Sequence, residues 1–184
     1  MPWYQRWGAG AAPLLAACFC LAGSAHAQVI TPDTTPLTFM EIPAGASLAG
    51  LSSRMVTLGA NPLRCVRSSR DHSVTECRGA LRQQGSPGPV EVWLSAIDSL
   101  AGIITFKHSG TSDRLNLWRD DLERRYGAVP TQVQGNQRMK QWVRRGRMIR
   151  LTWRREADGT SVSVSLVDGR VLDGWGRDRA NGEQ

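Results

Sequence analysis

Two stretches of the chain repeat apolar residues at intervals of three and four positions, the spacing of a helix with one buried face. The first stretch predicts a helix over 46–58, with Ser47 as its N-cap. The second predicts a helix over 112–126. The apolar positions are Leu48, Leu51, Met55 and Leu58 in the first, and Leu115, Trp118, Leu122 and Tyr126 in the second. A glycine and, three positions later, a proline end each predicted helix.

Seven further stretches have the length and apolar content of short strands. They are 63–68, 74–81, 90–97, 102–108, 138–143, 148–155 and 161–167. The run from Gly85 to Pro89, which is built from glycine, serine and proline, predicts a loop between the second and third strands. Alternation is clearest in the last two strands, where apolar residues at every second position separate from arginines, serines and threonines. We therefore predict an α+β fold whose sheet has one apolar face and one polar, arginine-bearing face.

The predicted elements recur in the same order in both halves of the chain. Residues 59–62 and 127–130 share the pattern Gly-Ala-x-Pro directly after a helix. Residues 90–106 align with the segment 60 positions later, which places Trp93 over Trp153 in apolar positions and Asp98 over Asp158 in turns. This order predicts an internal duplication, with one helix-then-antiparallel-sheet unit over 46–110 and another over 111–172. The alternative is chance, because unrelated helix ends also use glycine and proline.

The remaining parts of the chain carry weaker signals. Residues 28–45 are rich in threonine and proline and predict an extended leader. Residues 173–184 are polar and rich in glycine, and they predict a flexible tail. Of the tryptophans, Trp93, Trp118 and Trp153 occupy positions typical of a core, whereas Trp142 is either a core residue or a binding anchor.

The N-terminus has the three-part pattern of a secretory signal peptide over residues 1–27. Arg6 supplies a positive charge, residues 9–22 form an uncharged apolar run, and Ala25-His26-Ala27 places small residues at the cleavage positions. We expect cleavage before Gln28 and a periplasmic or secreted mature protein. No segment is long enough to predict a transmembrane helix, which needs about 20 apolar residues.

A second targeting signal overlaps the first. Leu15-Ala16-Ala17-Cys18 is similar to a lipobox, after which bacterial lipoproteins are cut and acylated on the cysteine. Cleavage there would give a lipoprotein anchored to the membrane at Cys18. The alternative interpretation treats Cys18 and Cys20 as apolar residues of the signal peptide, removed with it.

The mature chain keeps two cysteines, Cys65 and Cys77, each in a predicted strand. In an oxidising compartment this spacing favours a disulfide across a hairpin. A metal site would need more ligands than the nearby His72, and a redox pair would more typically have the spacing C-x-x-C. We predict a structural disulfide, with no metal and no cofactor.

Residues that could support catalysis do not form a recognised motif. The chain has no G-x-S-x-G elbow, no H-E-x-x-H motif and no phosphate-binding glycine loop. His72 and His108 are predicted in a loop and at a strand end. Asp120 and Asp121 are adjacent in a helix and point about 100° apart. We predict a protein without enzymatic activity; a small hydrolase with an unrecognised site is the alternative.

Basic residues are concentrated near the C-terminal end of the chain, whose formal net charge is +7. We predict a binding face made of Arg138, Lys140, Trp142, Arg150 and Arg154. Guanidinium groups bind carboxylates and phosphates through paired hydrogen bonds, so the expected ligand is a protein or an anionic component of the cell envelope. Nucleic acid is not expected, because an exported protein seldom meets it. A solvated face on a structural envelope protein is the alternative.

The repeated order resembles small exported modules of the beta-lactamase-inhibitor-protein type and the related SmpA/OmlA lipoproteins. The resemblance is carried by Gly45-Ala46-Ser47, which opens the first predicted helical segment, and by Leu58-Gly59-Ala60-Asn61-Pro62, which closes it. The closing motif has one extra residue before its proline. The resemblance implies a tandem fold and a binding function in which the sheet contacts a protein partner. It does not transfer particular binding residues.

Overall fold

A computed structural model of the chain describes residues 36–82 and 88–182. Three predictions concern residues that the structure does not describe. They are the signal peptide (1–27), the lipobox at Cys18 and residues 85–87 of the predicted loop.

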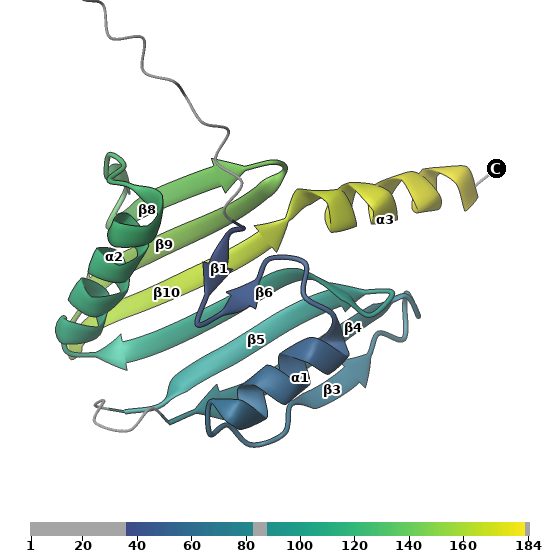
Figure 1. Cartoon of the computed structure of the whole chain (residues 1–184), viewed down its shortest axis with the longest axis horizontal. Helices are drawn as coiled ribbons and strands as arrows, with labels where there is room; N and C mark the ends of the chain where they lie inside the picture. The colour runs from purple at the N-terminus through teal and green to yellow at the C-terminus, as the bar shows by residue number, and fades with distance from the viewer. Residues whose placement is uncertain (1–35, 83–87, 183–184) are drawn as a thin grey trace, which may run out of the picture. The chain divides into compact units, whose positions relative to one another are not determined.

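The described residues form one eight-stranded antiparallel sheet and a separate two-stranded hairpin. The sheet contains β3 (Arg64–Arg67), β4 (Val74–Leu81), β5 (Val90–Ile97), β6 (Leu100–Gly110), β7 (Gln132–Gln134), β8 (Gln137–Arg144), β9 (Arg147–Glu156) and β10 (Gly159–Asp168). Their spatial order is β3-β4-β5-β6-β10-β9-β8-β7 (Figure 1). Two meanders therefore meet where β6 pairs with β10. This confirms the predicted α+β fold with an antiparallel sheet.

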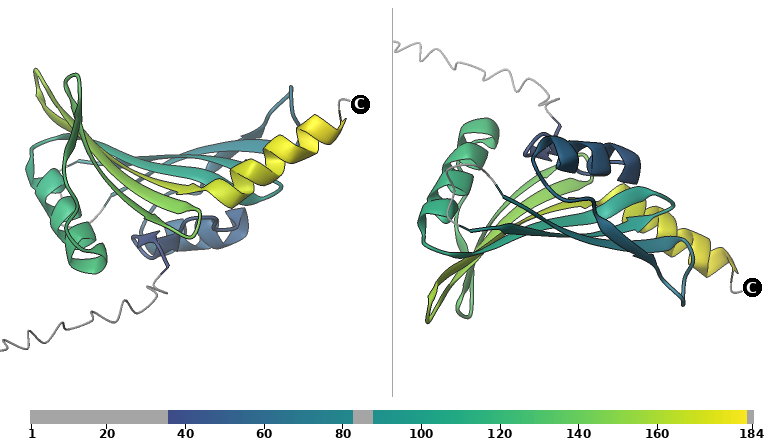
Figure 2. Two further views of the ribbon diagram at one scale, coloured as in Figure 1. Left: turned by 90° about the horizontal axis from the view of Figure 1, so that it is seen from above. Right: turned by 90° about the horizontal axis from the view of Figure 1, so that it is seen from below.

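Helices α1 (Leu48–Thr57) and α2 (Asp113–Tyr126) lie on the same face of the sheet, which we call the covered face (Figure 2). Ser47 caps α1 as predicted, because its Oγ accepts the N–H of Gly50 at 3.2 Å. The predicted apolar face of α2 is fully buried. Each helix precedes a run of four antiparallel strands, so both halves of the chain present helix and sheet in the same order.

The predicted leader is not extended throughout. Residues after Pro36 form a short hairpin of β1 (Thr38–Phe39) and β2 (Ile42–Pro43) on the covered face. The ring of Phe39 packs edge-on against Phe106 of β6 and Trp118 of α2, with centroids 5.3 and 5.2 Å apart. Such edge-to-face pairs are favourable arrangements of buried aromatic rings. The hairpin thus completes the core between the two helices.

The C-terminal segment is also more ordered than the sequence predicts. Residues Gly169–Gly182 form helix α3, which contacts β5, β6 and β9, in place of the flexible tail predicted over 173–184. A Cβ at Gly102 would lie 2.8 Å from Leu172 Cδ2, so the missing side chain makes room for α3. Trp175 Nε1 donates to Asp71 Oδ2 at 2.8 Å. Leu172 and Trp175 are three positions apart and share one side of α3, which explains the attachment.

Asp168 ends β10 and is buried, with 1% of its surface exposed. Arg147 Nε donates to its Oδ2 at 2.7 Å, and the backbone N–H of Arg170 donates to its Oδ1 at 3.0 Å. Burial alone would raise the pKa of this carboxyl, but the hydrogen bonds and charges of Arg170 and Arg147 lower the pKa to about 2. Asp168 therefore ties β9, β10 and α3 together as a carboxylate.

The predicted disulfide between Cys65 and Cys77 is formed. The two residues lie directly opposite each other on β3 and β4. The bond fastens the short edge strand β3 to the sheet. No helix within 36–82 and 88–182 is long and apolar enough to cross a membrane.

Candidate functional site

The face of the sheet opposite α1 and α2 is the candidate site, and we call it the open face. Its side chains follow from strand alternation and register, because residues paired across strands point to the same side. In the middle of the sheet the open face carries small hydroxyl residues of β6 and β10. Thr105 Oγ1 and Ser165 Oγ lie 3.0 Å apart and share a hydrogen bond across the two strands. Among the described strand residues, the charged members of this face are Arg64, Arg78, Lys107, Arg150 and Arg154, and Glu76, Glu91 and Glu156.

One row of side chains crosses five adjacent strands at right angles to them. Arg78 on β4 is paired with Trp93 on β5, which is paired with Thr105 on β6. Thr105 is paired with Ser165 on β10, and Ser165 with Arg150 on β9. With neighbouring strands about 4.8 Å apart, the Cα atoms at the two ends of the row lie about 19 Å apart. The row thus has a guanidinium at each end and an indole and two hydroxyls between them.

Two hollows lie on the open face on either side of Lys107. The larger has a volume of about 580 Å³ and is lined by Arg78, Gly79, Glu91, Val92, Trp93, Thr105 and Lys107. The smaller has a volume of about 180 Å³ and is lined by Lys107, Gln137, Thr152, Trp153, Arg154, Ser161 and Ser163. The hollows exist because small residues of the central strands are flanked by an indole on one side and arginines on the other.

The two arginines of β9 are held by neighbours on the same face. Arg150 donates from Nε and Nη2 to Gln141 Oε1 at 3.3 and 3.2 Å, across β8 and β9. Arg154 Nε donates to Glu156 Oε1 at 2.7 Å. A neutral amide leaves the charge of Arg150 uncompensated, whereas Glu156 partly neutralises Arg154. Arg150 is therefore the stronger candidate for contact with an anion.

The binding face predicted from the sequence is divided between the two sides of the sheet. Arg150 and Arg154 lie on the open face, but Arg138, Lys140 and Trp142 alternate to the covered face. There Lys140 Nζ forms an ion pair with Glu123 Oε1 at 2.7 Å. Trp142 is 4% exposed and donates from Nε1 to the carbonyl oxygen of Gly127 at 2.8 Å. The grouping was wrong because it followed nearness in sequence, which in a strand does not place residues on one side.

Trp93 is a site residue that the sequence reasoning assigned to the core. The structure places it half-buried on the open face, level with Arg78 and Thr105. The alternation of β5 contained the signal, since Glu91 and Ser95 flank Trp93 at the two-residue period and both are polar. The alignment of Trp93 with Trp153 led to its assignment to the core instead. Ser95 pairs with Ile103 and Ala96 with Ala101, so Gly102 is an extra residue in β6 and the two halves differ by one position there.

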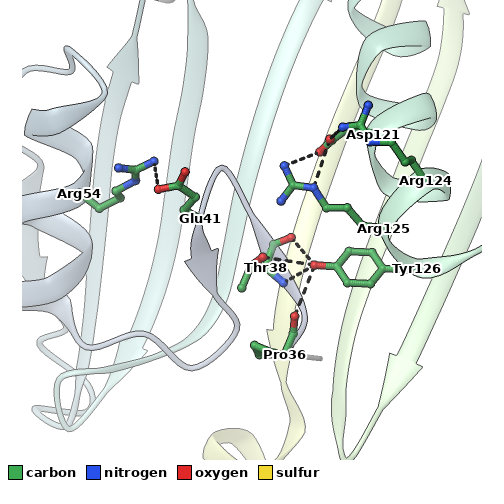
Figure 3. Close-up of polar contacts among 8 residues, drawn as sticks. All are labelled: Pro36, Thr38, Glu41, Arg54, Asp121, Arg124, Arg125 and Tyr126. Carbon is green, nitrogen blue, oxygen red and sulfur yellow. Dashed lines mark hydrogen bonds and ion pairs between the residues drawn. The ribbon is translucent and has the colours of Figure 1, made fainter. Parts of the chain in front are cut away.

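A further hollow, of about 370 Å³, lies on the covered face between α1 and α2. Four of its five charged lining residues form ion pairs, Arg54 with Glu41 and Arg125 with Asp121 (Figure 3). Beside it, the hydroxyl of Tyr126 accepts the N–H of Thr38 at 2.8 Å and donates to the carbonyl oxygen of Thr38 at 2.8 Å. These contacts fasten the N-terminal hairpin to α2. Because these contacts join parts of the fold, we interpret this cleft as structural. The open face is therefore the better candidate for a functional site.

The two histidines considered for catalysis lie apart. His72 is exposed in the connection between β3 and β4. His108 is 3% exposed, and its Nδ1 donates to the carbonyl oxygen of Pro89 at 3.0 Å. Within the described part of the chain neither histidine is hydrogen-bonded to a carboxylate, and no group of three or more His, Cys, Asp or Glu side chains could hold a metal ion.

The chain matches no protein-family model, no curated protein and no solved structure.

Proposed function

We propose that this protein is a non-catalytic binding module whose open face recognises an acidic surface of a partner protein. The observation that carries the proposal is the row from Arg78 through Trp93, Thr105 and Ser165 to Arg150. Arginine and tryptophan are the residues that contribute most to binding energy in protein interfaces. Small hydroxyl residues between them let a partner approach the backbone of the sheet closely.

The charge of this face sets the kind of partner. The described strands place five basic and three acidic side chains on this face, and one of the acidic residues, Glu156, is paired with Arg154. Charge complementarity raises association rates and excludes partners of the wrong sign. The half-buried indole of Trp93 favours a protein over an anionic envelope component, because a purely ionic ligand makes no use of it. Nucleic acid is not proposed as a partner, since an exported protein seldom meets it.

We propose that the protein acts outside the cytoplasm, in the periplasm or after secretion. The disulfide between Cys65 and Cys77 supports this location, because such bonds persist in oxidising compartments. The signal-like pattern of residues 1–27 supports it independently. Lipidation at Cys18 would anchor the same module to a membrane and leave the open face unchanged.

We also propose that the fold arose by internal duplication of a helix and four strands, as in the tandem modules that the sequence resembles. Both halves have the same order of elements, and the last strand of each pairs with the last strand of the other. The extra residue Gly102 has no counterpart in β10 and marks where the halves differ.

The partner can be sought by cross-linking in the producing cell. Ser163, at the centre of the open face, and Arg138, exposed on the opposite side, are replaced in separate variants by a photoreactive amino acid. We expect a defined cross-linked protein from position 163 and none from position 138. Combining Arg150→Glu with Arg154→Glu should reduce the cross-link by more than about tenfold, since two charge contacts become repulsive.

The matched control is Arg138→Glu, which makes the same charge change on the other side of the sheet. It should leave the cross-link from position 163 within about twofold of the unsubstituted level. Equal cross-linking from both positions, or a cross-link that survives the double reversal, would contradict the proposed function. If position 163 gives no protein adduct and the purified protein binds heparin instead, the face would be assigned to a polyanion.

A further inference from the structure

We infer that the larger hollow beside Trp93 is the specificity subsite of the open face, and that it takes a tyrosine flanked by carboxylates from an extended segment of the partner. This inference rests on the proposed function and names its ligand chemistry.

The shape of the hollow fits an aromatic side chain. It lies beside the half-buried indole of Trp93, and its neighbour Thr105 on the same face is small. The volume of about 580 Å³ is larger than one aromatic side chain needs, so flanking residues of the same segment fit as well. A ring stacked on the indole gains about 0.5–1.5 kcal/mol beyond the burial of its area.

The polar rim of the hollow selects tyrosine over phenylalanine. Glu91, on β5 next to Trp93 on the same face, and Thr105 supply oxygen acceptors for a phenolic O–H. A site that can accept a hydrogen bond rejects a ligand lacking the donor, because its own polar groups would be left without a partner on binding. Phenylalanine would leave the acceptors of this rim unused.

The cations of the hollow select the flanking residues. Arg78 borders it on β4 and Lys107 on β6, on opposite sides of Trp93. They are two strand spacings apart across the sheet and two residues apart along it, so their Cα atoms are about 12 Å apart, which four residues of extended chain span at about 3.4 Å each. A carboxylate before the tyrosine and another after it can therefore contact the two cations while the ring occupies the hollow. Further along, Lys107 also borders the smaller hollow, so the segment can continue toward Arg154.

The probe is the capped peptide acetyl-Asp-Asp-Tyr-Asp-Asp-amide, titrated into the isotope-labelled mature protein. Indole N–H signals are followed by NMR, and Trp93→Phe identifies the signal of Trp93. Trp118 of α2 and Trp142 of β8 are buried on the covered side of the sheet and serve as internal references. We expect the Trp93 signal to move with a saturating curve and the two reference signals to stay. Replacing the tyrosine of the peptide by serine, or its four aspartates by asparagine, should weaken binding about tenfold in each case.

Two arginines of the open face provide a matched pair of variants. Arg78→Gln removes a cation that lines the hollow and should weaken peptide binding about tenfold, whereas Arg64→Gln on the next strand, outside the lining, should change it less than about twofold. Shifts that centre on Arg150 and Arg154 with an unmoved Trp93 signal would overturn this inference and leave the proposed function standing. If none of the acidic peptides moves any open-face signal at millimolar concentration, both fall.

Discussion

Arg147 Nε donates to Asp168 Oδ2 across 2.7 Å, and this contact joins the first residue of β9 to the last residue of β10. The same carboxylate is 2% exposed as a side chain and also contacts Arg170 at the start of α3. Gly45 lies against it, since a Cβ there would come 2.2 Å from Asp168 Oδ2. Because two guanidinium groups contact this buried carboxylate, its ionised form stabilises the folded state.

Stability should therefore fall in acid through Asp168. Its pKa is about 2 in the folded protein, below the ordinary value of 3.8, so its contribution is complete above about pH 5 and is lost as the pH falls through 2. The shift corresponds to about 2 kcal/mol of unfolding free energy. Urea titrations of the wild type and Asp168→Asn should differ by about that amount at pH 7 and converge only as the pH falls below about 2. A constant difference from pH 7 to pH 2 would contradict this assignment.

A substitution at Trp142 should affect stability, whereas a substitution at Trp93 should affect binding. Trp142→Phe removes the hydrogen bond to the Gly127 carbonyl under the helices and should lower the unfolding free energy by about 1–2 kcal/mol, without changing partner cross-linking. Trp93→Leu alters a half-buried residue of the open face, and should reduce cross-linking about tenfold or more. Denaturant melts and cross-linking yields measured on the same preparations test both. The reverse pattern would show that the covered face is the binding surface.

The disulfide should stabilise the fold by restricting the unfolded chain. Cys65 and Cys77 enclose a short loop, and opening it should cost about 3 kcal/mol. Cys65→Ala combined with Cys77→Ala should show this loss in urea denaturation, and the wild type with dithiothreitol should approach the same midpoint. A variant whose midpoint equals that of the oxidised wild type would show that β3 needs no covalent attachment.

Helix α3 should detach without unfolding the sheet. Trp175→Phe removes the hydrogen bond from the indole to Asp71 but keeps a large apolar ring. We expect amide hydrogen exchange in α3 to accelerate about tenfold, because a lost hydrogen bond costs about 1 kcal/mol or slightly more. Amides of β6 and β10 should exchange as before and serve as the control. Equal acceleration in β6 and β10 would show that α3 unfolds only with the sheet.

Local periodicity was sufficient to predict the two long helices and most strands. The spacings around Leu51 and Leu122 place those residues in the core, where both are fully buried. The disulfide followed from two cysteines in neighbouring strands. The hairpin at Thr38 and helix α3 were missed because tertiary contacts stabilise them: Phe39 packs on Phe106 and Trp118, and Leu172 occupies the space that Gly102 leaves. Such contacts join residues far apart in sequence.

The candidate site was predicted only in part, for a related reason. Arg150 and Arg154 were placed correctly on the polar face because β9 alternates regularly. Trp93 was not, because its alignment with Trp153 was followed in place of the alternation of β5, in which the polar Glu91 and Ser95 flank it. The row from Arg78 to Arg150 depends on the pairing of β6 with β10, and no local pattern specifies that register.

The pairing of β6 with β10 also separates two timescales of folding. Every other neighbouring pair in the eight-stranded sheet joins strands consecutive in sequence, whereas Thr105 and Ser165 are 60 positions apart. Each meander can form from local contacts, but this junction must close a long loop first, and such contacts slow folding. We expect this junction to form after the two meanders, so the row from Arg78 to Arg150 is complete only at the last folding step.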